Sequence, residues 1–338
     1  MDVTRTTAVA AGVNDSLAYL ASDAALRSLE TDTYWPKWHS PWWHMLLLHE
    51  LGETRRIPEG AIASMVEGLN RLALKTFPIR PEDLPPGADE YRDTSCHCAV
   101  GTMYQVLATF GVDVDRAVPW MPPWLVHYQL PDGGHNCEGS AYLAGEPDAS
   151  SMVATVPLFE ALLARRQWNT DEHAVAERAA AFLIARELRH GSRSQHNASE
   201  REVAPSWLAP CFPRFYFYDV LRGLAVLVRW IEREGRPLSI ASPGSAGARS
   251  TPEGSAELID AITPVVEHLV TTFPDGIVRV QRHAHGGRRT LAQRDGVWVR
   301  EPTTSSFPLL EAASTLGAPS EALTRQWSAT RRALVGLL

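Results

Sequence analysis

Three of the four cysteines stand in a pattern that suits a metal ion. Cys96 and Cys98 are two residues apart, and Cys137 follows His135 by two residues in a glycine-rich turn. Because residues i and i+2 of an extended segment point to the same side, His135 and Cys137 can bind one ion together. Two or three thiolates with one imidazole suit Zn²⁺, and copper is the alternative metal. The competing interpretation is a group of buried free thiols beside a hydrogen-bonded histidine.

The spacing of Cys96 and Cys98 restricts how both can bind. Residues two apart on a regular helix point about 200° away from each other. If both thiolates bind the same metal, the helix must therefore begin after Cys98. Asp93 precedes the pair and His97 lies between its two cysteines, and we count both among the candidate catalytic residues.

Aromatic side chains and one histidine form a second group that suits a ligand cavity. Trp42, Trp43 and His44 are consecutive, and Tyr104 lies in another strongly apolar segment. The faces of such rings attract cations, so these residues are the candidates for a substrate-binding wall. Packing within the core is the alternative role. His49 is five residues from His44, which is a poor match to one helix face, and we expect it in the core.

The segment 212–222 carries a third group of polar side chains. Arg214 and Tyr218 are four residues apart, as are Tyr218 and Arg222, and Asp219 can pair with Arg222 at i+3 on a helix. Tyr218 and Asp219 are candidates for proton transfer, and Arg214 is a candidate for binding an anionic substrate. The alternative is an ion-paired start of a helix.

The elements that would position these residues are helices of two kinds. One kind is apolar on nearly all sides, as in 40–52, where Ser40 is a candidate N-cap, Pro41 the first helical residue and Gly52 the stop. The other kind is amphipathic. The apolar segments are 40–52, 95–111, 150–163, 212–228 and 305–317, and the amphipathic ones are 57–72, 113–129, 171–191, 255–273 and 319–338.

Alternation of these two kinds predicts an all-α fold with two concentric layers. A helix that is apolar all round must be surrounded by protein, whereas an amphipathic helix can face solvent. Five or six such hairpins would close into one α/α toroid over residues 1–338, with the segment 14–30 as an extra outer helix. An open solenoid is the alternative. The glycine- and serine-rich stretch 232–255 reads as a loop, and 277–300 predicts a small β-hairpin around Gly286 and Gly287.

A toroid would bring the beginnings of the inner helices to one end of a central cavity. Several of the candidates lie at or near these beginnings: His44, Asp93, Cys96, His97, Cys98, Arg214, Tyr218 and Asp219. The positive ends of the helix dipoles would favour anions there and lower the pKa of nearby thiols.

One segment resembles the repeat of the terpenoid cyclase and protein prenyltransferase superfamily. That repeat has the pattern Gln, glycine-rich turn, aromatic residue, and Gln129 and Gly133 match it while His135 stands at the aromatic position; 272–278 is a weaker copy. The resemblance implies a short, bacterial, single-toroid branch. The acidic D-x-D-D motif of the cyclases is broken at 113–116, and the Asp-x-Cys metal motif of the prenyltransferases is one residue too long at 93–96.

Composition narrows the possible functions further. The 338 residues hold 39 acidic and 32 basic side chains, with a net charge of −7, so no basic surface for nucleic acid is expected. No apolar run approaches the roughly 20 residues of a membrane span, and the first 20 residues lack a signal-peptide pattern, which predicts a cytoplasmic protein. Motifs for ATP and NAD are absent.

We therefore expect a cavity enzyme that acts on a small, largely apolar metabolite with a transition metal. A metal-free terpenoid-type cyclase or isomerase is the first alternative. A non-catalytic toroid that binds or assembles is the second.

Overall fold

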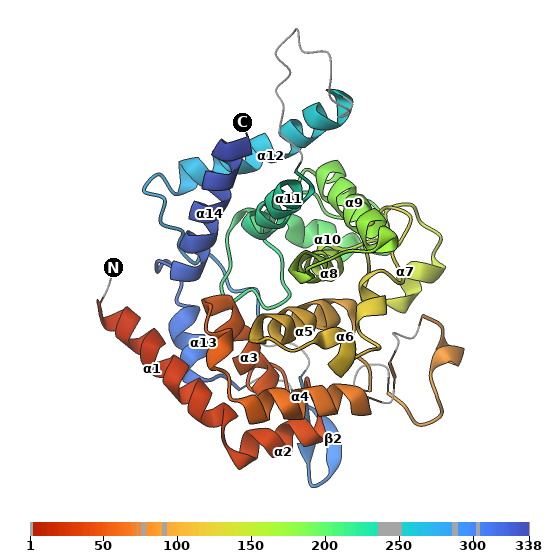
Figure 1. Ribbon diagram of the computed structural model, residues 1–338, viewed down its shortest axis with the longest axis vertical. Helices are drawn as coiled ribbons and strands as arrows, with labels where there is room; N and C mark the ends of the chain where they lie inside the picture. The colour runs from red at the N-terminus through yellow and green to blue at the C-terminus, as the bar shows by residue number, and fades with distance from the viewer. Residues whose placement is uncertain are drawn as a thin grey trace.

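The computed structural model describes residues 3–72, 74–75, 79–89, 93–235, 252–285, 290–301 and 305–337. This part of the chain is mostly helical and ends with a two-stranded antiparallel hairpin and two further helices (Figure 1). The elements are α1 (Val3–Leu20), α2 (Asp23–Thr31), α3 (Pro41–Leu51), α4 (Glu59–Arg71), α5 (His97–Phe110), α6 (Val114–Ala117), α7 (Gly139–Leu143), α8 (Met152–Ala164), α9 (Thr170–Ala185), α10 (Ala198–Val203), α11 (Val220–Glu234), α12 (Pro252–Thr272), β1 (Thr290–Arg294), β2 (Val297–Glu301), α13 (Pro308–Ala313) and α14 (Glu321–Leu337).

Four apolar helices form the centre of the molecule. In α3 every residue from Pro41 to Leu48 is buried, and α5, α8 and α11 are buried along most of their length. Figure 1 shows these four helices in the middle, with α1, α2, α4, α9 and α14 towards the outside. Helix α3 contacts α5, α5 contacts α8, and α8 contacts α11. The predicted burial of these apolar segments is therefore confirmed.

Helices α5 and α8 approach each other most closely at a glycine. A Cβ atom on Gly101 would lie 2.4 Å from the backbone carbon of Pro157, a distance that no methyl group can occupy. Nearby, the Gln105 side chain donates to the Pro157 carbonyl oxygen at 3.0 Å. The close packing places the beginning of α5 beside the loop that leads into α8.

Several predicted helices are shorter than expected or divided. The segment 113–129 forms α6 and a 3-10 turn at Pro122–Leu125, because prolines at 119, 122 and 123 cannot donate the hydrogen bonds of a continuing helix. Helix α11 begins only at Val220, and the last apolar helix covers only Pro308–Ala313. The segment 14–30 is divided where Ser22 caps α2.

The hairpin lies inside the predicted range but turns at a different place. Asp295 and Gly296 connect β1 to β2 with φ values of 51° and 79°, as a two-residue type I′ turn requires. The predicted turn at Gly286 and Gly287 lies outside the described residues, as do residues 236–251 of the predicted loop 232–255. Among the described residues, no helix is both long and apolar enough to cross a bilayer.

Candidate metal centre

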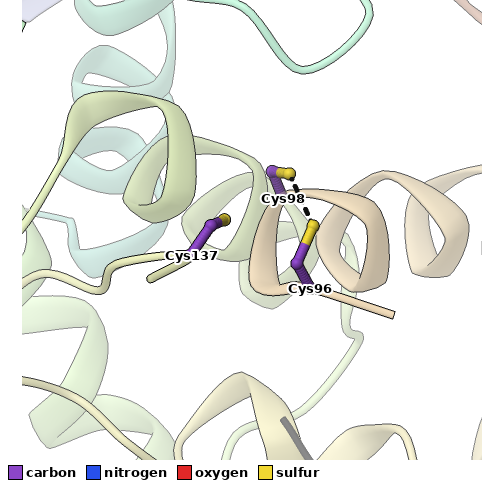
Figure 2. Close-up of side chains that lie close together, drawn as sticks. All are labelled: Cys96, Cys98 and Cys137. Atoms are coloured by element: carbon purple, nitrogen blue, oxygen red, sulfur yellow. Dashed lines mark hydrogen bonds between the residues drawn. The ribbon is translucent and has the colours of Figure 1, made fainter. Parts of the chain in front are cut away.

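Three thiols meet where α5 begins. The Sγ atoms of Cys96, Cys98 and Cys137 all lie within 4.8 Å of one another, and those of Cys96 and Cys98 are 3.1 Å apart (Figure 2). Cys96 is the N-cap residue of α5, with extended backbone (φ −75°, ψ 167°), and Cys98 lies in the first turn. Because Cys96 is outside the helix, the 200° separation does not apply to the pair. The condition that both thiols can meet only if the helix begins after Cys98 is thus wrong: the helix begins at His97, and both thiols still meet.

Cys137 belongs to a loop that is fixed to the beginning of α8. The backbone N–H of Ser151 donates to the His135 carbonyl oxygen at 2.8 Å, and the His135 N–H donates to the Thr155 hydroxyl at 2.9 Å. One residue before Cys137, the Asn136 side chain accepts from the Glu138 N–H at 3.0 Å. The backbone bends at Cys137 within this local turn.

His135 is accordingly not in the thiol group, contrary to the sequence-based expectation. Within the described part of the chain, the donor atoms that meet are the three thiols alone. The His135 ring is buried and packs against His97, with 5.3 Å between the ring centroids. Burial lowers the pKa of His135 well below its usual range, so its imidazole is neutral. The predicted metal-ligand set is corrected to Cys96, Cys98 and Cys137.

His97, a predicted catalytic residue, joins the two segments that carry the thiols and does not line the cavity. Its side chain is fully buried, and its Nδ1 lies 2.7 Å from the Asn136 carbonyl oxygen. The bond joins the first turn of α5, which carries Cys98, to the loop that carries Cys137. Burial lowers the pKa of His97 to about 4, so the ring is neutral and its N–H can donate to the carbonyl oxygen.

Hydrogen bonds among the three thiols shift their pKa values in different directions. Hydrogen bonds from Cys137 and Cys98 hold the pKa of Cys96 well below its ordinary value, and the same bond to Cys96 raises the pKa of Cys137. The positive charge of Lys37 acts in the same direction on Cys96. These interactions favour deprotonation of Cys96, and the thiolate is the form that metals bind.

A cavity of about 950 Å³ lies against the thiols. Cys96 and Cys137 both form part of its wall, so one side of the cluster is open to small molecules. Its charged lining residues are Lys37, Arg80, Asp89, Glu138 and Arg300, and its aromatic ones are Tyr34 and Trp35. The wall is thus more polar than the expected apolar substrate site.

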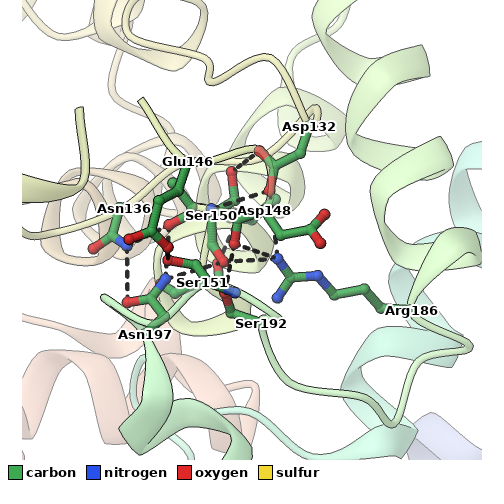
Figure 3. A network of polar contacts seen from close by, with 12 residues as sticks. Asp132, Asn136, Glu146, Asp148, Ser150, Ser151, Arg186, Ser192 and Asn197 are labelled. Carbon is green, nitrogen blue, oxygen red and sulfur yellow. Dashed lines mark hydrogen bonds and ion pairs between the residues drawn. The ribbon is translucent and has the colours of Figure 1, made fainter. Parts of the chain in front are cut away.

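A polar network joins the loops around Asn136 and Ser150 (Figure 3). The Arg186 guanidinium lies 2.9 Å from a carboxylate oxygen of Glu200 and 3.4 Å from one of Asp132, and donates to the Ser150 carbonyl oxygen at 3.0 Å. Asn136 donates to the Ala149 carbonyl oxygen at 2.6 Å. No sequence pattern predicts a functional role for these residues. The one local signal was the position of Asp132 and Asn136 on either side of the glycine pair in the turn.

The three polar candidates at 214–219 are used in ion pairing and in bonds within the core. Asp219 is the N-cap of α11, accepting from the Arg222 backbone, and its carboxylate pairs with Arg214 at 2.7 Å. The Tyr218 hydroxyl donates to the Leu188 carbonyl oxygen at 2.7 Å. The predicted i,i+4 and i,i+3 side-chain pairs are wrong because residues 214–219 precede the helix; the Arg222 guanidinium pairs with Glu160 instead, at 2.6 Å.

The aromatic candidates are core residues and do not line the cavity. Trp42 and Trp43 are fully buried, and the Trp43 indole donates to the Tyr34 carbonyl oxygen at 3.1 Å. His44 stacks on Phe307 with 3.7 Å between ring centroids. The Tyr104 hydroxyl accepts from Arg165 at 3.1 Å.

Asp93 lies close to the cavity in sequence, since Thr94, Ser95 and Cys96 all line it. Its carboxylate accepts from the Asp89 N–H at 2.9 Å, and its carbonyl oxygen accepts from the Leu74 N–H at 3.0 Å. These bonds give Asp93 a role in shaping the segment before α5.

Comparison of the chain with protein-family models, curated proteins and solved structures finds no match.

Proposed function

We propose that this protein is a metal-dependent enzyme whose reaction takes place in the cavity beside Cys96, Cys98 and Cys137. The observation that carries the proposal is the convergence of three thiols, two of which form part of the cavity wall. A ligand that enters the cavity would therefore lie next to a metal held by these sulfur atoms. The substrate class is a small molecule, in keeping with the cavity volume of about 950 Å³.

Zinc is the metal that the donor set favours. Sulfur ligands select Zn²⁺ or Cu(I), and tetrahedral zinc needs a fourth ligand beyond the three thiolates. Structural zinc sites usually take all four ligands from the protein, whereas catalytic sites keep one position for water or substrate. Three protein sulfurs beside a cavity match the catalytic type. In that position zinc acts as a Lewis acid on a polar group of the substrate.

The architecture in this proposal is an α/α toroid like that of the terpenoid cyclase and protein prenyltransferase superfamily. The chain of contacts from α3 through α5 and α8 to α11 supports it, as does the stacking of His44 on Phe307, which joins the first apolar helix to the segment before the last. The Gln129 side chain of the repeat-like motif donates to the Gly133 carbonyl oxygen at 2.7 Å and to that of Val175 at 2.9 Å. Gln129 thus joins its glycine turn to α9.

A second candidate function is a non-catalytic binding protein with the same metal. The observation in its favour is that Tyr218 and Asp219, the residues proposed for proton transfer, are used in packing and ion pairing. Conversion of a ligand separates the two functions, since a binding protein would release it unchanged.

Metal analysis of the purified protein is the first test. After expression in zinc-supplemented medium, we expect about one zinc per wild-type chain and a large loss in the double variant Cys96→Ser/Cys137→Ser. Cys211→Ser is the matched control, because Cys211 is buried beside Asp219 and lies outside the thiol group. Wild-type protein with little bound metal, or equal metal in the double variant, would refute the metal centre.

The second test looks for turnover. Zinc-loaded wild-type protein and the double variant are incubated with a small-molecule extract, and mass spectrometry follows each compound. Consumption of a compound by the loaded protein alone supports the enzyme. A compound that is retained by the loaded protein and recovered intact supports the binding protein instead.

A further inference from the structure

Lys37 is an unusual residue for this chain. Only two of the 32 basic side chains that Lys and Arg provide are lysines, Lys37 and Lys75, and the rest are arginines. Lys37 lines the cavity together with Cys96 and Cys137. Its ammonium group is a compact point charge, which differs from the broad, planar guanidinium that the chain uses elsewhere.

Four aromatic rings and a hydroxyl group hold this ammonium in place. Its Nζ lies 5.3 Å from the ring centroid of Trp35 and 5.6 Å from those of Tyr34, Trp38 and Tyr216. Nζ also donates to the Tyr216 hydroxyl at 3.1 Å. The faces of the rings attract a cation and so favour the charged form of the amine. The aromatic cage therefore maintains a positive charge at the cavity.

The backbone of Lys37 is anchored as well. Its N–H donates to the Thr290 hydroxyl at 2.9 Å, and Thr290 on β1 is itself buried and lines the cavity. This bond joins the hairpin to the segment before α3. The two bonded residues are more than 250 positions apart in sequence. The position of the charge is thus set by contacts from distant parts of the chain, as a preorganised binding group requires.

Charged and apolar residues both line the cavity. Of the described lining residues, Lys37, Arg80 and Arg300 are basic, and Asp89 and Glu138 are acidic. The ammonium of Lys37 is a single point charge, which a carboxylate with one negative charge can match. Aromatic and aliphatic wall residues, such as Trp35 and Leu291, can contact an apolar body attached to that anion.

We infer that Lys37 binds the carboxylate of a small monocarboxylic acid in the cavity beside the three cysteines. The inference rests on the proposed function in one respect: the acid is the substrate of the metal centre. Anion binding by Lys37 itself needs no metal, and this difference lets the two ideas be tested separately.

Reductive methylation of lysine amines in the wild-type protein tests the inference, because a ligand bound to Lys37 should slow labelling of that residue. The chain has only two lysines, and peptide mass spectrometry tells them apart. The probe is benzoate at constant ionic strength, with benzamide as its neutral isostere and inorganic phosphate as the other anion. At ten times its Kd, benzoate should slow labelling of Lys37 about tenfold, since protection follows occupancy. Lys75, which donates to the Leu72 carbonyl oxygen at 2.8 Å, is the internal control and should label at an unchanged rate.

Two variants check that the charge of Lys37 is responsible. Calorimetry should show benzoate binding at least about tenfold weaker in Lys37→Met, and partly restored in Lys37→Arg. Zinc content, measured on the same samples, should remain at the wild-type level in both variants.

Three results would overturn the inference: Lys37 labelling that benzoate does not slow, equal protection by benzamide, and protection by phosphate alone. Protection by benzoate in a protein that holds no metal would instead refute the proposed function and leave the carboxylate site standing. A metal-loaded protein in which benzoate does not slow the labelling of Lys37 would refute the carboxylate site and leave the proposed function standing.

Discussion

The Nδ1 atom of His97 lies 2.7 Å from the backbone oxygen of Asn136, so a buried imidazole joins the two segments that carry the cysteines. Neither partner touches the thiols through this bond. It nevertheless sets the distance between Cys98, one residue after His97, and Cys137, one residue after Asn136. Bonds of this kind around a metal site are known to affect how tightly the metal is held.

Replacing His97 should therefore weaken metal binding while all three thiols remain. We expect His97→Phe to lower zinc affinity by about 10-fold to 100-fold, as measured by competition with a chromophoric chelator. His268→Gln is the control. His268 belongs to α12, away from the thiols in sequence, and its ring also bonds a backbone oxygen, that of Leu208, at 2.9 Å. Equal zinc affinity in wild type and His97→Phe would contradict the positioning role.

Alkylation of the thiols should depend on the metal. After treatment with a chelator, iodoacetamide should modify Cys96, which lines the cavity and has a lowered pKa, faster than Cys137, whose pKa is raised, and zinc should protect both. Cys211 should remain unmodified in either state, because it is buried and burial raises its pKa to about 12. Peptide mass spectrometry of the folded protein gives the modified fraction of each cysteine. Modification of Cys211 before Cys96 would show that the cluster is less accessible than the structure has it.

Glu50 should make stability depend on pH. It accepts from the Arg214 N–H at 2.8 Å, and burial raises its pKa from 4.5 to about 7. Between these values the folded protein binds a proton that the unfolded chain does not, so this contribution is present at low pH and is lost as pH rises through 7. From pH 5 to 8, the free energy of unfolding of wild type should fall by roughly 2 to 3 kcal/mol relative to Glu50→Gln.

Urea denaturation at several pH values measures this difference. Glu59→Gln, at an exposed position in the first turn of α4, controls for the loss of a carboxylate. A constant difference between wild type and Glu50→Gln across the range would show that Glu50 has the same pKa in both states.

The contact of α5 with α8 should tolerate no added methyl group at its closest point. The Cβ atom of Gly101→Ala would meet the Pro157 backbone at 2.4 Å, so the helices must move apart, and we expect a loss of about 1 to 3 kcal/mol or more in unfolding free energy. Gly60→Ala, in α4 with open space around it, should instead stabilise the protein by up to about 1 kcal/mol. Chemical denaturation distinguishes the two, and equal effects would contradict the close approach.

The helical layer structure was largely predictable because its signals are local. Runs of apolar residues that begin after Ser40 or Ser151 and end near glycine or a charged segment identify the buried helices, and their burial follows from composition alone. Helix ends were less predictable: residues 212–219 are as apolar and aromatic as the helix that follows, yet they lie outside it.

The amino-acid sequence alone indicated which helices are buried and proposed Cys96, Cys98 and Cys137, together with His135, as ligands, since apolar patterns and residue spacing are properties of short segments. Only the tertiary structure decided that His135 turns away, that Tyr218 and Asp219 are used in packing, and that Lys37 faces the cavity with the thiols. These outcomes depend on loop turns and on contacts between residues up to 253 positions apart. Periodicity within one segment carries no information about such contacts.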